Sequence, residues 1–132
     1  MECQSLDTEF WNEEFKWIKE RNICTQKDYV DSDRIGRGSK IRMSEKDKKM
    51  AFELFELYNR KMQENNYMDF EDVICYILNN KNRIKEDVKI EYVLVDEAQD
   101  LSFAKLSVIK LLTKESLTIA ADTAQKIYDP SF

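Results

Sequence analysis

Acidic residues follow two short apolar segments in the C-terminal third of the sequence. Asp96 and Glu97 come directly after one apolar segment, and Asp122 follows the next. A carboxylate at a strand end can hold Mg²⁺ through water, and a neighbouring carboxylate can orient or deprotonate an attacking water. Gln125 can reach a γ-phosphate, because an amide both donates and accepts hydrogen bonds. Nucleoside triphosphate hydrolysis needs side chains of these types.

The same carboxylates also have a purely structural interpretation. Glu97, Asp100 and Asp122 can each supply favourable negative charge at the start of a helix. A metal-dependent nuclease is the weakest alternative, since Asp96 and Glu97 would point to opposite faces if both lay in a strand. From the residues alone, phosphate chemistry and helix initiation remain equally good explanations.

The first two thirds of the sequence are predicted to be helical. Apolar residues at helical spacing, preceded by capping residues and followed by Asn or basic residues, predict helices over 7–21, 25–29, 44–64 and 70–80. The predicted caps are Asp7, Thr25, Ser44 and Asp69. The stretch 31–40, which holds both glycines, is expected to be an irregular connection.

The character of the sequence changes at Ile90. Apolar, β-rich runs over 92–95 and 117–121 flank a predicted helix over about 103–113, capped by Asp100 or Ser102. Strand, helix and strand in this order form a βαβ unit with parallel strands. Parallel sheets are buried on both faces, so this unit is expected to be part of a larger sheet.

Composition excludes several kinds of site. The 132 residues are 42% apolar and 36% charged, as in one folded domain, and they include no histidine, which excludes His-based triads and zinc–His sites. Gly36 and Gly38 are the only glycines, so neither GxxxxGK[ST] nor GxGxxG is present.

Three isolated cysteines favour reduced thiols in a cytoplasmic protein, with Cys24 and Cys75 acting as small apolar residues. No apolar run approaches the ~20 residues of a membrane span.

Charge is unevenly distributed along the chain. The net charge is −5, yet residues 34–50 carry seven basic and two acidic groups. This segment could contact a phosphate backbone or be a solvated loop and first helical turn. Its first four basic residues are Arg34, Arg37, Lys40 and Arg42.

YVLVDEAQDLS, followed after one predicted helix by LTIAADTAQKIY, resembles motifs II and III of superfamily 1 DNA helicases of the UvrD/Rep family. Motif II has the form DExQD in that family and motif III the form GDxxQxIY, so Ala121 stands where glycine is usual. Upstream, the segment 69–72 resembles the family's DFDD-like helix start. The segment 34–68 resembles the region between motifs I and II.

The resemblance implies roles in a nucleotide site for five of these residues. Asp96 would coordinate Mg²⁺, and Glu97 would activate the attacking water. Asp122 would lie nearby in the nucleotide site, and Gln99 and Asp100 match motif II without a defined role.

The resemblance also implies contacts with DNA. Gln125 would couple the γ-phosphate to bound DNA, and Tyr128 would face single-stranded DNA, where it could stack on a base. A core position is the alternative for Tyr128. The segment 34–68 falls near the family's 1B subdomain, which contacts duplex DNA, so Arg34, Arg37, Lys40 and Arg42 are expected DNA contacts.

The predicted fold class is α/β, with a mostly helical region over 1–89 and, over 90–132, a βαβ piece of an incomplete RecA-like (P-loop NTPase) sheet. The predicted function is that of a fragment of an ATP-dependent 3′–5′ DNA helicase. It would use ATP, Mg²⁺, DNA and the remainder of the helicase chain, and it would be inactive alone because the P-loop and the second RecA-like lobe are missing. The alternative is a standalone interaction module without catalytic activity.

Overall fold

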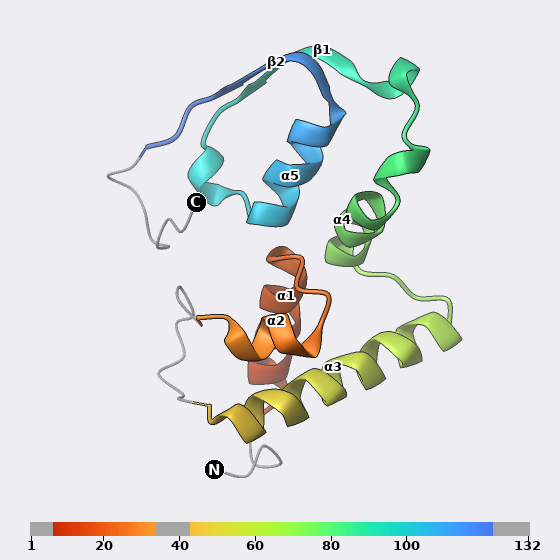
Figure 1. Ribbon diagram of the computed structural model, residues 1–132, viewed down its shortest axis with the longest axis vertical. Coiled ribbons are helices and arrows are strands. Elements are labelled where there is room, and N and C mark those ends of the chain that lie inside the picture. Colours follow the sequence, from red (N-terminus) through yellow and green to blue (C-terminus); the bar gives the residue numbers. More distant parts are fainter. Residues whose placement is uncertain (1–6, 34–42, 123–132) are drawn as a thin grey trace.

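The computed structural model describes residues 7–33 and 43–122 of the chain. Helices come first along this part and a βαβ unit follows (Figure 1). The α-helices and strands are α1 (Thr8–Glu20), α2 (Gln26–Asp31), α3 (Glu45–Glu64), α4 (Phe70–Asn79), β1 (Ile90–Val95), α5 (Phe103–Leu112) and β2 (Thr113–Ile119). Short 3₁₀ turns lie between α4 and β1, and η4 (Ala98–Asp100) lies between β1 and α5.

Each described α-helix begins after a polar side chain that accepts a hydrogen bond from the backbone N–H three residues later. The five caps are Asp7, Thr25, Ser44, Asp69 and Ser102. This confirms the four caps predicted for the helical region and selects Ser102 over Asp100 before α5. Ser44 and Asp69 form full capping boxes, in which the third helical residue returns a hydrogen bond to the cap.

Helices α1, α2 and α3 share one aromatic core. Its buried members are Phe15, Trp17, Ile18, Tyr29, Ala51, Phe52 and Phe55. Tyr29 is fully buried and its hydroxyl donates to Glu14 Oε1 at 2.5 Å, so the buried carboxylate of Glu14 has a hydrogen-bond partner. Edge-to-face and tilted ring pairs connect the three helices, as between Trp17 and Tyr29 and between Tyr29 and Phe52.

A buried lysine joins α1 to the start of α4. Lys19 Nζ lies 2.5 Å from Asp69 Oδ2 and 2.6 Å from Asp72 Oδ1, and 5.0 Å from the centre of the Tyr58 ring. Asp69 and Asp72 are also the two members of the α4 capping box. The acidic residues of the DFDD-like segment therefore start α4 and attach it to α1.

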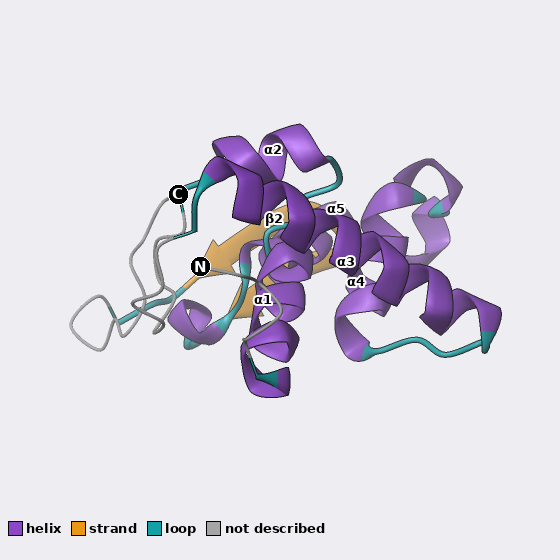
Figure 2. Ribbon diagram, turned by 90° about the horizontal axis from the view of Figure 1, so that it is seen from below, coloured by secondary structure: helices purple, strands orange, loops and turns teal. Residues whose placement is uncertain are grey.

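The two strands are parallel and are covered on one face. Val93 pairs with Leu117 and Leu94 with Thr118 in the register. Buried Val95, Ala98 and Leu106, with Val93 and Leu117 against them, form the contact between the sheet and α5. Figure 2, seen from below Figure 1, shows the strands behind the helices, so the described helices lie on one side of the sheet.

The prediction for the second strand is wrong at its start. The structure places β2 at Thr113–Ile119, four residues earlier than the predicted apolar run 117–121. Helix α5 ends at Leu112 and Thr113 Oγ1 donates to the carbonyl of Ile109 at 2.8 Å, so the chain passes from helix to strand without a loop. Thr113 pairs with Ile90 and Ser116 with Tyr92, and the register is irregular between these pairs, so β2 begins with polar residues that carry no apolar signal.

The prediction that Cys24 behaves as a small apolar residue is also wrong. Cys24 is exposed, and its thiol donates to the carbonyl of Asn22 at 3.4 Å. Cys75 is half-buried, and its thiol donates to the carbonyl of Lys19 at 3.5 Å. Both are free thiols, as predicted. Within the described ranges, no helix is both long and apolar enough to cross a membrane.

Candidate functional site

The ends of β1 and β2 meet at one edge of the sheet, and the backbone holds them together beyond the last paired residues. Ala120 N donates to the carbonyl of Val95 at 2.8 Å, and Ala98 N donates to the carbonyl of Ala120 at 3.0 Å. The segment after β1 is therefore fixed beside the segment after β2. The structure thus brings Asp96 and Glu97 to the same edge as Asp122, as predicted from parallel pairing.

The chain turns sharply at Glu97. Strand β1 ends at Val95, and Glu97 has a left-handed backbone conformation with φ 51° and ψ 41°. A non-glycine residue in this region costs about 1–2 kcal/mol, and such outliers concentrate at functional sites. Side chains of neighbouring residues point to opposite faces only within a strand. Asp96 and Glu97 lie beyond the end of β1, so this argument against a site shared by both carboxylates does not apply.

The carboxylate of Asp96 supports this turn with one oxygen. Asp96 Oδ1 accepts from Glu97 N at 2.9 Å, while Oδ2 makes no hydrogen bond within the described part of the chain. Asp96 and Glu97 are both exposed. One carboxylate oxygen of Asp96 is thus available to a ligand in front of the strand ends.

Gln99 links the two strand ends through its side chain. Its Oε1 accepts from Asp122 N at 3.1 Å, and its Nε2 donates to Glu97 Oε2. Gln99 is half-buried, whereas Glu97 and Asp122 are exposed. Nothing in the sequence indicated this contact, because the partners of Gln99 are 2 and 23 residues away.

The helix-initiation interpretation accounts for less of this arrangement. Ser102 caps α5, and the Glu97 side chain makes no capping hydrogen bond to the three-residue turn η4. Asp100 is exposed, and its side chain makes no hydrogen bond among the described residues. The structure therefore brings Glu97, Gln99 and Asp122 into one hydrogen-bonded group and leaves Asp100 outside it.

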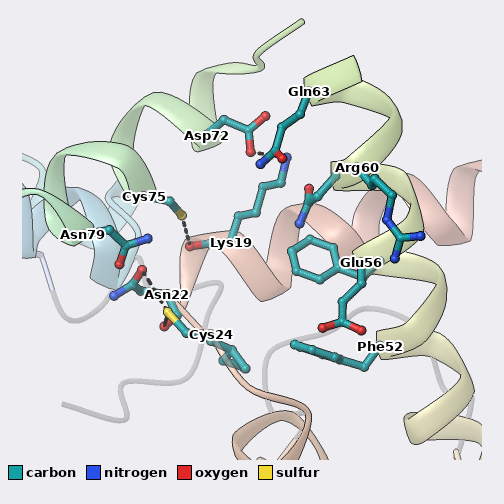
Figure 3. Close-up of a pocket in the computed structure, with 13 residues that line it drawn as sticks. Lys19, Asn22, Cys24, Phe52, Glu56, Arg60, Gln63, Asp72, Cys75 and Asn79 are labelled. Carbon is teal, nitrogen blue, oxygen red and sulfur yellow. Dashed lines mark hydrogen bonds and ion pairs between the residues drawn. The ribbon is translucent and has the colours of Figure 1, made fainter. Parts of the chain in front are cut away.

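A separate cavity of about 430 Å³ lies between α1, α3 and α4 (Figure 3). Asn22 and Cys24 border it on one side, and Glu56 and Arg60 of α3 on the other. None of the residues predicted for nucleotide binding lines it. Its volume is in the range of small-molecule pockets, and its lining includes Asp72 of the DFDD-like segment.

A family model for the UvrD/REP helicase N-terminal domain matches residues 3–129. The chain belongs to this family. The UvrD/REP match therefore extends over the helical region and the βαβ unit alike, and it confirms the resemblance found in the sequence.

Several curated helicases of the same family are similar to the chain. The ATP-dependent DNA helicase Rep of Buchnera aphidicola subsp. Baizongia pistaciae is 38% identical over 84 residues, which are 58% of this chain and 12% of the relative. The ATP-dependent DNA helicase PcrA of Staphylococcus epidermidis is 31% identical over 86 residues, 60% of this chain and 12% of the relative. A probable DNA helicase II homolog of Mycoplasma capricolum is 37% identical over 82 residues, 57% of this chain and 11% of the relative.

These matches cover only a small part of each helicase, between 11% and 12% of its length. No solved structure matches the chain.

Several positions expected to contact DNA or the γ-phosphate in this UvrD/REP family member lie outside the described residues. They are Gln125, Tyr128, Arg34, Arg37, Lys40 and Arg42.

The donor set at the strand ends fits Mg²⁺ bound together with a nucleotide better than a bare ion. No group of three or more Asp, Glu, Cys or His side chains converges in residues 7–33 and 43–122. Magnesium is usually held by one or two carboxylates, with waters and substrate phosphates completing its shell. The free oxygen of Asp96, with Glu97 beside it, matches that requirement.

Proposed function

We propose that this chain is part of an ATP-dependent 3′–5′ DNA helicase, and that the edge at the ends of β1 and β2 is one side of its nucleotide site. The observation that carries the proposal is the hydrogen bonding of the segment after β1 to the segment after β2, which gathers Glu97, Gln99 and Asp122. Membership of the UvrD/REP family supports it.

In this proposal the acidic residues after β1 form motif II. Asp96 is the ligand of Mg²⁺, which supplies charge neutralisation at the phosphates when it is bound with ATP. Glu97, exposed and one residue away, accepts the proton of the attacking water. Gln99, Asp100 and Asp122 belong to the same nucleotide site.

The segment after β2 is motif III, and it connects nucleotide to DNA. Gln125 couples the γ-phosphate to bound DNA, and Tyr128 faces single-stranded DNA. Arg34, Arg37, Lys40 and Arg42 meet the phosphate backbone, because four cations so close in sequence give a strong local attraction for a polyanion.

The sheet is a piece of a RecA-like sheet that the remainder of the helicase chain completes. Tyr92 and Leu94 of β1 are 73% and 74% exposed on the face that α5 does not cover. A parallel sheet is normally covered on both faces. The 132 residues also contain no GxxxxGK[ST] loop. In this proposal the remainder of the helicase chain holds the phosphates.

The test is DNA-stimulated ATP hydrolysis by the protein at its native length. Glu97→Gln is expected to lower kcat by at least about 100-fold, because it removes the general base while keeping the side-chain size. Glu115→Gln, at an exposed position on β2, is the matched control and should keep wild-type turnover. Equal activity of Glu97→Gln and wild type would refute the assignment.

The 132-residue chain alone is expected to show no DNA-stimulated ATP hydrolysis, since it lacks a phosphate loop. Robust turnover by this chain that disappears in Glu97→Gln would contradict the proposed incompleteness.

The exposed apolar face of β1 also favours a second candidate, an interaction module that docks on a partner. The native size separates the two candidates. An immunoblot band several-fold heavier than 15.8 kDa supports the helicase, and a band at 15.8 kDa supports the module.

A further inference from the structure

Gln99 occupies an unusual position among the residues at the strand ends, because it touches both of the segments that meet there. Its Oε1 accepts from the backbone N–H of Asp122, after β2, at 3.1 Å. Its Nε2 donates to Oε2 of Glu97, after β1. The oxygen and the nitrogen of one amide thus each contact a different strand end.

The backbone explains why the amide reaches both partners. The left-handed conformation of Glu97 turns the chain into η4, in which Asp100 N donates to the carbonyl of Glu97 at 3.0 Å. This turn brings Gln99 back toward the carboxylate of Glu97. The bond from Ala98 N to the carbonyl of Ala120 then sets the distance to Asp122.

Only a glutamine satisfies both contacts at this length. Glutamate keeps an acceptor for Asp122 N but has no donor for Glu97, and it adds a like charge beside it. Methionine has the same length and neither contact. Gln99 is half-buried, so each lost contact is only partly replaced by water.

We propose that Gln99 is a positioning residue that fixes the orientation of the Glu97 carboxylate relative to the end of β2. This inference rests on the proposed role of Glu97 as the group that activates water. In this role Gln99 lies within the nucleotide site but acts through Glu97, not as a ligand of the nucleotide or the metal. A displacement of the backbone at Asp122 moves the Gln99 amide, and with it the carboxylate of Glu97, so the geometry for water activation depends on the position of the segment after β2.

The contact is tested first in the 132-residue chain by NMR. A scalar coupling across the hydrogen bond between Asp122 ¹⁵N and Gln99 ¹³Cδ is expected in the wild type. In Gln99→Met the Asp122 amide proton should shift upfield, whereas Gln99→Glu should keep it near the wild-type position. Gln63→Met, at an exposed position on α3, is the control. An Asp122 amide proton that does not move in Gln99→Met would show that the contact is absent and overturn the inference.

The role is tested by steady-state ATP hydrolysis of the protein at its native length. Both Gln99→Met and Gln99→Glu lose the donor to Glu97, so both should lower kcat at least tenfold, within the 10²–10⁴-fold that a general base contributes, and leave KM for ATP within about twofold. Unchanged kcat in both variants would overturn the inference, as would a raised KM at constant kcat, which marks a nucleotide ligand. A loss in Gln99→Met alone would show that Gln99 acts through Asp122 and not through Glu97.

These outcomes are separate from failure of the proposed function. If Glu97→Gln retains wild-type turnover, the role of Glu97 falls and the positioning role of Gln99 falls with it, while the NMR result still decides whether the contact exists. If Glu97→Gln is inactive and the Gln99 variants are fully active, only the inference about Gln99 is refuted.

Discussion

Replacing Lys19 by methionine tests how much of the stability of the helical region depends on one buried cation. The side chain of Lys19 is 2% exposed, and its ammonium is held by Asp69 and Asp72. Removing one partner of a buried ion pair costs about 3–5 kcal/mol, because the remaining charge stays buried. The side chains of Asp69 and Asp72 are 32% and 23% exposed, so water recovers part of this cost. We expect Lys19→Met to lower the free energy of unfolding by about 2–3 kcal/mol.

Urea unfolding followed by the fluorescence of Trp11 and Trp17 measures this change. With a urea slope of about 1–3 kcal/mol/M, the midpoint should fall by about 0.7–3 M. Lys16→Met on the same helix is the matched control. Lys16 is 58% exposed and pairs with Glu20 at 3.8 Å, a surface contact worth at most about 0.5 kcal/mol.

The effect of Lys19→Met depends on pH in a definite direction. Burial opposes the charge on Lys19, but the hydrogen bonds and charges of Asp69 and Asp72 outweigh it and raise its pKa. This contribution is present below pH 10.5 and is lost as pH rises above it. Burial likewise opposes ionisation of Asp69, but the hydrogen bonds from Lys19 and Asp72, together with the charge of Lys19, outweigh it and lower the pKa of Asp69. That contribution is present above pH 3.8 and is lost as pH falls below it.

The stability difference between wild type and Lys19→Met is therefore expected to be constant from about pH 5 to 9 and to shrink at about pH 3. A difference below about 0.5 kcal/mol at pH 7, or one that does not shrink at pH 3, would refute this account of the buried cation.

Three further predictions follow from single positions. Glu97→Gly is expected to raise the free energy of unfolding by about 0.5–1 kcal/mol, since glycine accepts the left-handed conformation, while it abolishes ATP hydrolysis at native length; a destabilised variant in urea unfolding would contradict this. In a Cys3→Ser background at pH 8, iodoacetamide should alkylate exposed Cys24 well before Cys75, because burial raises the pKa of Cys75 to about 11; equal rates by mass spectrometry would count against it. Ser44→Ala removes the α3 cap and should cost about 1 kcal/mol in urea unfolding, and an unchanged midpoint would argue that α3 does not need it.

Local signals predicted the helices well. Asp7, Ser44 and Asp69 were identified as caps because a cap and the N–H it accepts from are three residues apart in sequence. Helix α3 ends at Glu64, as the asparagines at positions 65 and 66 predicted, and Asn66 has a left-handed backbone conformation. Boundaries of this kind depend on neighbours along the chain, so the sequence contains the information.

Contacts between residues far apart in the sequence could not be predicted from such local signals. Glu14 and Lys19 look like solvent-facing charges on α1, yet they are buried against Tyr29 and Asp69, 15 and 50 residues away. The start of β2 at Thr113 was not predicted, because the first residues of β2 are polar. They form a strand through pairing with β1, which is distant in sequence. At the candidate site, the meeting of the two strand ends followed from topology, whereas the Gln99 contact depends on the turn at Glu97.

The direct passage from α5 into β2 has a mechanical consequence. Leu112 ends the helix, Thr113 begins the strand, and the Thr113 hydroxyl is bonded back to Ile109. Because no loop separates them, the end of α5 and the start of β2 are expected to move together. Strand β2 continues to Ile119, shortly before Asp122. A displacement of α5 along its axis would therefore move the start of β2 with it, whereas a residue inserted between positions 112 and 113 would add slack between helix and strand.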